Sequence, residues 1–287
     1  MVVMTDGSRP VSPGTVGVFD SGVGGLSVVR ALIASMPSQP LSYVADNAHC
    51  PYGPRPASEI IAFAKGITRY LHNQGCQAIV VACNTASAAA LGALRETFPD
   101  ISFVGMVPAI KPAAGLTRTG VVGVLATAGT LHGRLYEDVV EHWAHGARIV
   151  SRSCPGLVER VENGDANAPE TESLLRQCLA PLLAEGMDVL VLGCTHYPFL
   201  IPALERLLPP GVSIVEPSDA IARQTRRILA KRGLLATDGP PVPRHYAATG
   251  EPDALQRALD HLLHEQPHVQ RAMWQRDPLA SLWLANT

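Results

Sequence analysis

AIVVACNT at residues 78–85 and DVLVLGCTH at residues 188–196 share one pattern. In each stretch a continuous apolar run of strand length ends at a cysteine and a helical pattern follows, which places Cys83 and Cys194 on turns between a strand and a helix. In open α/β sheets such turns line the ligand crevice, because helix N-termini point free N–H groups into it. Two such thiols, one from each half of the chain, predict a site with two sides.

Short apolar runs alternate with helical patterns through most of the chain. This alternation is typical of βαβ units and predicts an α/β fold with mainly parallel sheets. The eight predicted strands are Val16–Phe19, Leu41–Ala45, Ala78–Ala82, Ile101–Val104, Val121–Leu125, Ala147–Val150, Val189–Leu192 and Val212–Val215.

The second half of the chain repeats features of the first. GVFDS at residues 17–21 resembles GVLAT at residues 123–127, and 63 positions separate Asp20 from Cys83 while 67 separate Thr127 from Cys194. We therefore expect two similar α/β domains, related by a pseudo-twofold axis, with the active site in the cleft between them. The predicted first domain comprises residues 1–107 and 217–287, with a disordered lead over 1–14, and the second comprises residues 108–216. The tail from His264 onward shows no clear pattern.

Composition excludes several classes of function. The chain has 287 residues, 47% of them hydrophobic, and a net charge of −2 without a cluster of basic residues, so neither nucleic acid nor a membrane surface is expected as a partner. No segment has the length and apolarity of a membrane span or a signal peptide, which predicts a cytoplasmic protein with a small-molecule substrate. In that reducing compartment the six cysteines are not expected to form disulfides, and no Cys-x-x-Cys pair indicates a metal site.

Both cysteines have neighbours suited to proton transfer. Asn84 or Thr85 can cap the helix that follows Cys83, and its dipole favours an anion beside the thiol. Thr195 and His196 follow Cys194, and the histidine can act as a proton partner. The alternative is that each thiol is an ordinary packed residue at a strand end.

The segment DSGVGGLS at residues 20–27 follows the first predicted strand as an anion-binding loop would. Asp20 is placed to receive an ammonium group or to orient an acid–base group, although a simple Asp-Ser cap is an alternative. A dinucleotide fingerprint is the nearest rival, because Gly22 and Gly24 fit it and Asp46 lies at a suitable distance. Ser27 replaces its third glycine, however.

Three further segments offer polar groups whose roles the sequence leaves open. The turn at residues 51–54 can present backbone N–H groups to a carboxylate or can be only a rigid turn. Thr127 and Thr130 can bind a ligand or cap a helix. Glu159 and Glu162 lie on one side of a predicted helix, as site residues or as part of a solvated face.

Six ordered motifs make the chain resemble the bacterial glutamate racemases, over about residues 16–230. They are DSGxGG at residues 20–25, YxxD at 43–46, PYG at 51–53, CNTA at 83–86, ATxGT at 126–130 and GCTHYP at 193–198. The resemblance implies a cofactor-independent isomerase that uses no metal, often dimeric, whose D-glutamate supplies peptidoglycan synthesis. The same fold acting as an aspartate racemase or a decarboxylase, and a two-domain protein that binds an amino acid without chemistry, are the alternatives.

The resemblance also implies roles for individual residues. Cys83 would take the proton from D-glutamate and Cys194 from L-glutamate, assisted by Asp20 and His196. Glu162 matches the family's helix acid better than Glu159, although Arg160 stands where an apolar residue is usual. The residues that would hold the substrate are Asp20, Ser21, Tyr52, Gly53, Asn84, Thr85, Thr127, Thr130, Thr195 and His196.

Overall fold

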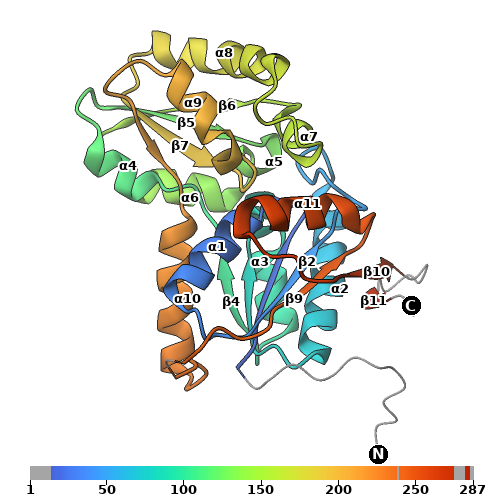
Figure 1. Ribbon diagram of the computed structural model, residues 1–287. Coiled ribbons are helices and arrows are strands. Elements are labelled where there is room, and N and C mark those ends of the chain that lie inside the picture. Colours follow the sequence, from blue (N-terminus) through green and yellow to red (C-terminus); the bar gives the residue numbers. More distant parts are fainter. Residues whose placement is uncertain (1–13, 238, 275–281, 285–287) are drawn as a thin grey trace, which may run out of the picture.

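The computed structural model describes residues 14–237, 239–274 and 282–284 and contains two sheets (Figure 1). The larger sheet has the strand order β11-β10-β9-β2-β1-β3-β4. Of the predicted disordered lead, residues 1–13 lie outside the described residues. The strands of this sheet are β1 (Val16–Asp20), β2 (Leu41–Ala45), β3 (Ala78–Val81), β4 (Ser102–Gly105), β9 (His245–Ala248), β10 (Val269–Trp274) and β11 (Leu282–Leu284).

The smaller sheet has the order β6-β5-β7-β8 and all its neighbouring strands are parallel. This order matches β2-β1-β3-β4 in the larger sheet, so the internal repeat expected from the sequence is confirmed in the topology. All eight predicted strands are present, with bounds within one residue of those expected except that β6 ends three residues later. The strands here are β5 (Val121–Ala126), β6 (Arg148–Ser153), β7 (Val189–Gly193) and β8 (Ser213–Val215).

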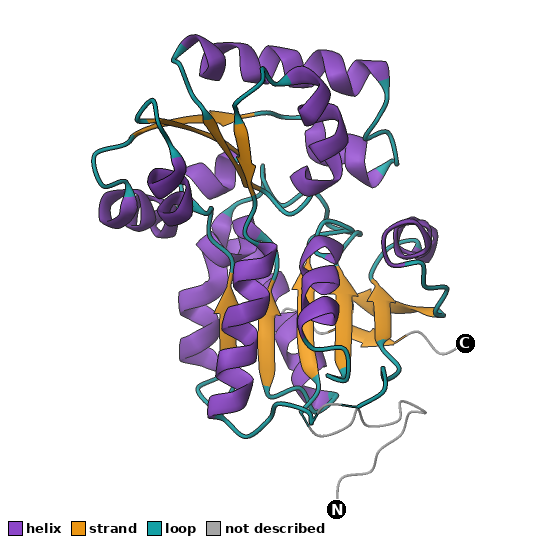
Figure 2. Ribbon diagram, turned by 60° about the vertical axis from the view of Figure 1, so that its left-hand side comes forward, coloured by secondary structure: helices purple, strands orange, loops and turns teal. Residues whose placement is uncertain are grey.

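Helices cover both faces of the larger sheet, and alternate strand residues divide between them (Figures 1 and 2). Val18 and Val80 face α1, α10 and α11, whereas Phe19 and Val81 face α2 and α3. Because both faces are buried, the strands are apolar throughout rather than alternating. The bounds are α1 (Leu26–Ser35), α2 (Ala57–Asn73), α3 (Asn84–Thr97), α10 (Ser218–Lys231) and α11 (Pro252–Leu263).

The smaller sheet is covered in the same way. Leu190 and Leu192 pack toward α8 and α9, whereas Val189 and Val191 pack toward α4 and α6. The bounds are α4 (Ile110–Leu116), α5 (Ala128–Leu131), α6 (Arg134–Trp143), α7 (Leu157–Glu162), α8 (Pro169–Ala184), the 3-10 helix η1 (Tyr197–Leu200) and α9 (Ile201–Leu207).

The C-terminal part of the chain returns to the larger sheet. Helix α10 packs on α1, and β9 then pairs in parallel with β2, with Tyr43 beside Tyr246. Strand β10 extends the sheet beyond β9, where the sequence showed no clear pattern. Val269 and Ala272 are buried while neighbouring positions of this strand are partly exposed, and this short, interrupted burial explains why no apolar run marks it.

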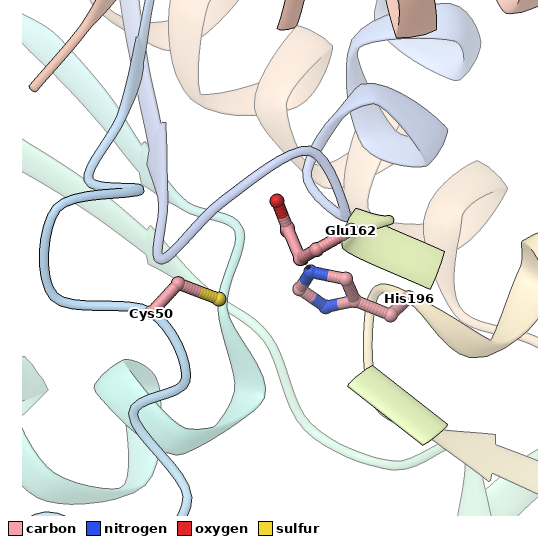
Figure 3. A group of neighbouring side chains, drawn as sticks. All are labelled: Cys50, Glu162 and His196. Carbon is pink, nitrogen blue, oxygen red and sulfur yellow. Dashed lines mark hydrogen bonds and ion pairs between the residues drawn. The ribbon is translucent and has the colours of Figure 1, made fainter. Parts of the chain in front are cut away.

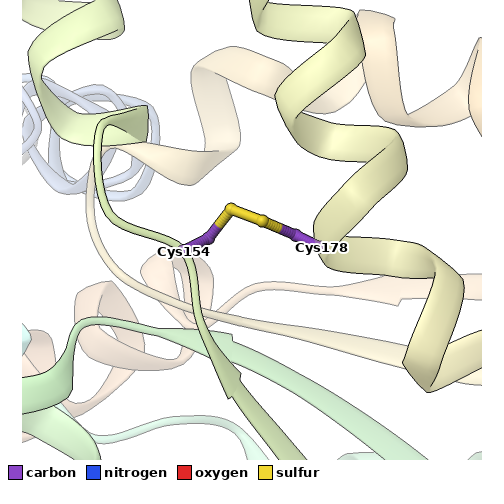
Figure 4. Close-up of a disulfide and its surroundings, with 2 residues drawn as sticks. All are labelled: Cys154 and Cys178. Atoms are coloured by element: carbon purple, nitrogen blue, oxygen red, sulfur yellow. A yellow bond between two sulfur atoms is a disulfide. The ribbon is translucent and has the colours of Figure 1, made fainter.

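A disulfide joins Cys154 to Cys178, with their Cα atoms 6.0 Å apart (Figure 4). The expectation that the cysteines form no disulfide is therefore wrong for this pair. Cys154 lies between β6 and α7, and Cys178 lies within α8, so the bond fastens α8 to the segment that leads into α7. Sequence spacing did not indicate the pair, because 24 positions separate the two residues and only the packing of α8 brings them together.

Candidate active site

A cleft lies where the carboxyl ends of strands from both sheets meet. Its free volume in this structure is about 10 Å³, roughly the space of one water molecule, so the two sheets must separate to admit a larger ligand. Both thiols predicted to face a common site line it. The lining residues are Ser21, Pro51, Tyr52, Gly53, Cys83, Asn84, Thr85, Thr127, Val158, Cys194, Thr195 and His196.

Cys83 itself is the N-cap of α3, and its sulfur accepts a hydrogen bond of 3.5 Å from the backbone N–H of Ala86. The expectation that Asn84 or Thr85 caps this helix is wrong, because the helix begins one residue earlier than that assignment requires. The thiol also donates to the hydroxyl of Ser21 at 3.9 Å. Burial, assisted by the negative charge of Asp20, raises the pKa of Cys83 to about 12.

Cys194 lies beside an imidazole that is paired with a carboxylate. The sulfur is 3.8 Å from Nδ1 of His196, and Nε2 of the same ring is 2.5 Å from Oε1 of Glu162. Burial alone would lower the pKa of His196, but hydrogen bonds to Cys194, Cys50 and Glu162 raise it well above its ordinary value. The structure thus places Glu162, and not the exposed Glu159, against the cleft.

Asp20 connects the two sheets behind the cleft wall. Its carboxylate accepts hydrogen bonds of 2.9 Å from the N–H of Gly22 and 2.9 Å from the hydroxyl of Thr195. Burial raises the pKa of Asp20, and the neighbouring charge of His196 and these hydrogen bonds oppose that rise. The side chain is fully buried and is hydrogen-bonded to Thr195, which lines the cleft.

The glycines of the loop at residues 20–25 make room for this machinery. A Cβ atom at Gly22 would lie 1.9 Å from Oε1 of Glu162, and one at Gly24 would lie 2.4 Å from Nδ1 of His196. The N–H of Val23 donates to Oε1 of Glu162 at 2.8 Å. The loop therefore binds an anion, as its sequence suggested, but that anion is the protein's own carboxylate.

Three threonine hydroxyls meet across the two sheets. Oγ1 of Thr85 lies 2.8 Å from Oγ1 of Thr127, and Oγ1 of Thr130 lies 3.0 Å from that of Thr127. Thr127 also caps α5, which confirms the capping role that the sequence left open for it. Gly53 lies close to Thr127, since a Cβ atom at this glycine would be 3.2 Å from the Cβ atom of Thr127.

Asn84 is the polar side chain that the fold leaves unpartnered in the cleft. It is 2% exposed, and neither its amide oxygen nor its amide nitrogen has a hydrogen-bond partner in the described structure. Burying a polar group in this way costs about 1–3 kcal/mol. An amide offers both a donor and an acceptor, so a ligand carrying carboxylate and ammonium groups would satisfy it.

Asp46 organises the loop that carries Tyr52. Its carboxylate accepts hydrogen bonds from the hydroxyls of Tyr52 and Thr249, at 2.5 and 2.6 Å, and from the indole N–H of Trp274 at 2.8 Å. The residue is fully buried. The carboxylate of Asp46 is thus hydrogen-bonded to other side chains of the protein and is not available to bind a ribose. A dinucleotide site at Gly22 and Gly24 needs such an acid, so the structure argues against it.

The predicted site residues divide into two groups. Most of them line the cleft, whereas Asp20, Thr130 and Glu162 each contact a lining residue from behind. Cys50 was not foreseen. It precedes the predicted PYG turn, so its neighbourhood in the chain was the available signal. Its sulfur points toward His196, close to Glu162 (Figure 3).

The similarity to known proteins agrees with this geometry. The model of the Asp/Glu/Hydantoin racemase family matches residues 26–225. The glutamate racemase of Ectopseudomonas mendocina is 49% identical over 258 residues, which are 90% of this chain and 98% of that protein. Among solved structures, glutamate racemase RacE1 from Bacillus anthracis superposes with a TM-score of 0.80 at 34% identity, covering 90% of this chain and 96% of that one.

The Escherichia coli glutamate racemase, solved in complex with L-glutamate and the activator UDP-MurNAc-ala, superposes with a TM-score of 0.77 at 35% identity. The match covers 87% of this chain and 95% of that chain. With both sheets, the cleft and its paired cysteines in place, the chain belongs to the Asp/Glu/Hydantoin racemase family, within its group of glutamate racemases.

Proposed function

We propose that the protein interconverts L- and D-glutamate by a two-thiol mechanism without an organic cofactor. The observation that supports this most strongly is that Cys83 and Cys194 follow strands of different sheets and line one cleft. Inversion at a carbon atom needs a base on one face and an acid on the other. The relatives named above are glutamate racemases, which indicates the substrate.

In the L-to-D direction, the thiolate of Cys194 removes the α-proton and the thiol of Cys83 gives a proton to the opposite face. The roles exchange in the reverse direction. Because burial raises the pKa of Cys83 to about 12, this residue stands as the thiol, the form that donates. His196 lies 3.8 Å from the Cys194 sulfur, where it can pass a proton to or from that thiol.

Preorganised donors stabilise the negative charge that develops on the substrate's carboxylate. The α3 N-terminus supplies backbone N–H groups beside Cys83, and the helix dipole favours an anion there. Asn84 supplies the unpartnered amide. The residues proposed to contact the substrate are Ser21, Tyr52, Gly53, Asn84, Thr85, Thr127, Thr195 and His196, with Asp20 and Thr130 orienting them and Glu162 orienting His196.

Several further expectations belong to this proposal. We expect residues 1–107 and 217–287 to form one domain and residues 108–216 to form a second. The two domains would close on the substrate. Among the described residues no helix is long and apolar enough to cross a membrane. A cytoplasmic homodimer that supplies D-glutamate for peptidoglycan is the expected cellular form. Light scattering tests the dimer, and rescue of a bacterium that requires D-glutamate tests the supply.

Racemisation in deuterium oxide tests the mechanism. With L-glutamate as substrate and without added cofactor, the D-glutamate formed first should carry deuterium at the α-carbon while the remaining L-glutamate stays protonated, because different thiols serve the two faces. Cys83→Ala and Cys194→Ala should each abolish racemisation, with Cys76→Ala as the control at a buried cysteine remote from the cleft.

Full turnover in both active-site variants would refute the two-thiol mechanism. Deuterium entering L-glutamate before D-glutamate forms would indicate a single base. Calorimetric binding of glutamate without any change in its optical rotation would favour the alternative of a binding protein without chemistry. A panel of amino-acid substrates that includes L-aspartate tests the alternative of an aspartate racemase, which would racemise L-aspartate in preference to L-glutamate.

A further inference from the structure

Three side chains that can ligate a metal ion meet around His196, which lines the cleft, although none is near another in the sequence. Cys50 lies in the loop after β2, Glu162 ends α7, and His196 follows β7. One ligand atom from each lies within 4.8 Å of the others (Figure 3). Cys50 and Glu162 are half-buried, whereas His196 is buried.

We propose that Cys50, Glu162 and His196 form a Zn²⁺ site and that zinc bound there inhibits the enzyme. Zinc ions take sulfur, imidazole nitrogen and carboxylate oxygen at about 2.0–2.3 Å, so a tetrahedral ion holds its ligand atoms roughly 3.3–3.7 Å apart. The three ligand atoms therefore need to move by no more than about 1 Å each to reach this geometry.

The donor set selects the kind of metal. Thiolate and imidazole ligands favour zinc over Mg²⁺ and Ca²⁺, which prefer sites made only of oxygen ligands. When zinc binds, the Cys50 thiol and the hydrogen-bonded His196–Glu162 pair each release a proton to water. The resulting thiolate and carboxylate balance the two charges of the ion. No electron is transferred, so the step needs no oxidant.

Inhibition follows from the position of the ion. His196 and Glu162 form the pair beside Cys194, and zinc replaces the 2.5 Å hydrogen bond that joins them. The ion also links the loop after β2 of the larger sheet to the segment after β7 of the smaller sheet. Bound zinc would therefore hold the cleft closed. This part of the inference rests on the proposed racemase activity, whereas metal binding itself does not.

Cobalt binding to the full-length protein tests the site separately from activity. Thiolate ligation of Co²⁺ gives charge-transfer absorption in the near ultraviolet, and titration gives the stoichiometry and affinity. We expect one Co²⁺ per chain with this absorption, competed by Zn²⁺. Cys50→Ala and Cys50→Ser should remove the absorption, and Glu162→Gln should weaken binding at least about tenfold.

Matched variants distinguish this site from binding elsewhere. Glu159→Gln, on the exposed side of the same helix, and Cys76→Ala should bind Co²⁺ as the unmodified protein does. If the thiolate absorption persists in both Cys50 variants, Cys83 or Cys194 holds the metal and the inference is wrong. Absence of thiolate absorption in the unmodified protein also overturns it. Zinc inhibition of the racemase should need at least about tenfold more metal in Cys50→Ser.

Discussion

Substitution of Gly22 by alanine should act entirely through Glu162. The new Cβ atom would lie 1.9 Å from Oε1 of Glu162, whereas real Cβ contacts are not shorter than 3.0 Å, so the carboxylate must move by at least 1.1 Å. That displacement breaks its 2.5 Å hydrogen bond to His196 and its 2.8 Å hydrogen bond from Val23. Gly22 does not have a positive φ, so the backbone accepts alanine.

The size of the effect on catalysis follows from the hydrogen bond between Glu162 and His196, because His196 is the residue beside Cys194. A hydrogen bond to a charged group contributes about 1.5–3 kcal/mol, so Gly22→Ala should lower kcat/KM for glutamate by roughly 10- to 150-fold. The pKa of His196 should fall as well, because Glu162 is one of the groups, with Cys194 and Cys50, whose hydrogen bonds oppose the effect of burial. Racemisation followed by circular dichroism across a pH series measures both quantities.

The double variant with Glu162→Gln provides the decisive comparison. Because both substitutions remove the same interaction, the double variant should be as active as the less active of the two single variants. Gly92→Ala is the control, since a Cβ atom there meets nothing within 4 Å and the residue lies on α3. Full activity in Gly22→Ala, or losses that multiply in the double variant, would refute the reasoning.

The remaining predictions concern stability and substrate affinity. Cys178→Ser should lower the free energy of unfolding by about 3.5 kcal/mol, the loop-closure effect for a 24-residue separation, in denaturant titrations without reductant. The unmodified protein should show four free thiols when it is unfolded without reductant, and six would contradict the disulfide. Burial would raise the pKa of Asp188, but hydrogen bonds from Thr117 and the two following residues lower it to about 2. The stability that Asp188 contributes is thus present above about pH 4 and is lost as the pH falls toward 2. The difference in melting temperature between Asp188→Asn and the unmodified protein should therefore become smaller over that range. Asn84→Ala should raise KM for glutamate about tenfold without lowering the melting temperature, because it removes an amide buried without partners; an unchanged KM would remove Asn84 from the substrate site.

Some local details could not be predicted from neighbouring residues. Cys83 caps α3 with its own sulfur, although the adjacent asparagine and threonine are far commoner caps. Gly22 and Gly24 fit an anion-binding loop, but the anion comes from Glu162, which is about 140 residues away. Asp46 fits a nucleotide motif by spacing alone, and only its four side-chain partners in the fold show that it supports the loop carrying Tyr52.

The sequence by itself determined the eight strands up to Val215, their parallel arrangement and the position of each thiol at a strand end, because apolar periodicity and strand-end turns are local properties that neighbouring residues encode. Tertiary structure alone decided which side chains meet: Glu162 with His196, Cys50 with both, and Cys154 with Cys178. These contacts join segments from separate elements, and their distances depend on how sheets and helices pack. No pattern within one segment records that packing.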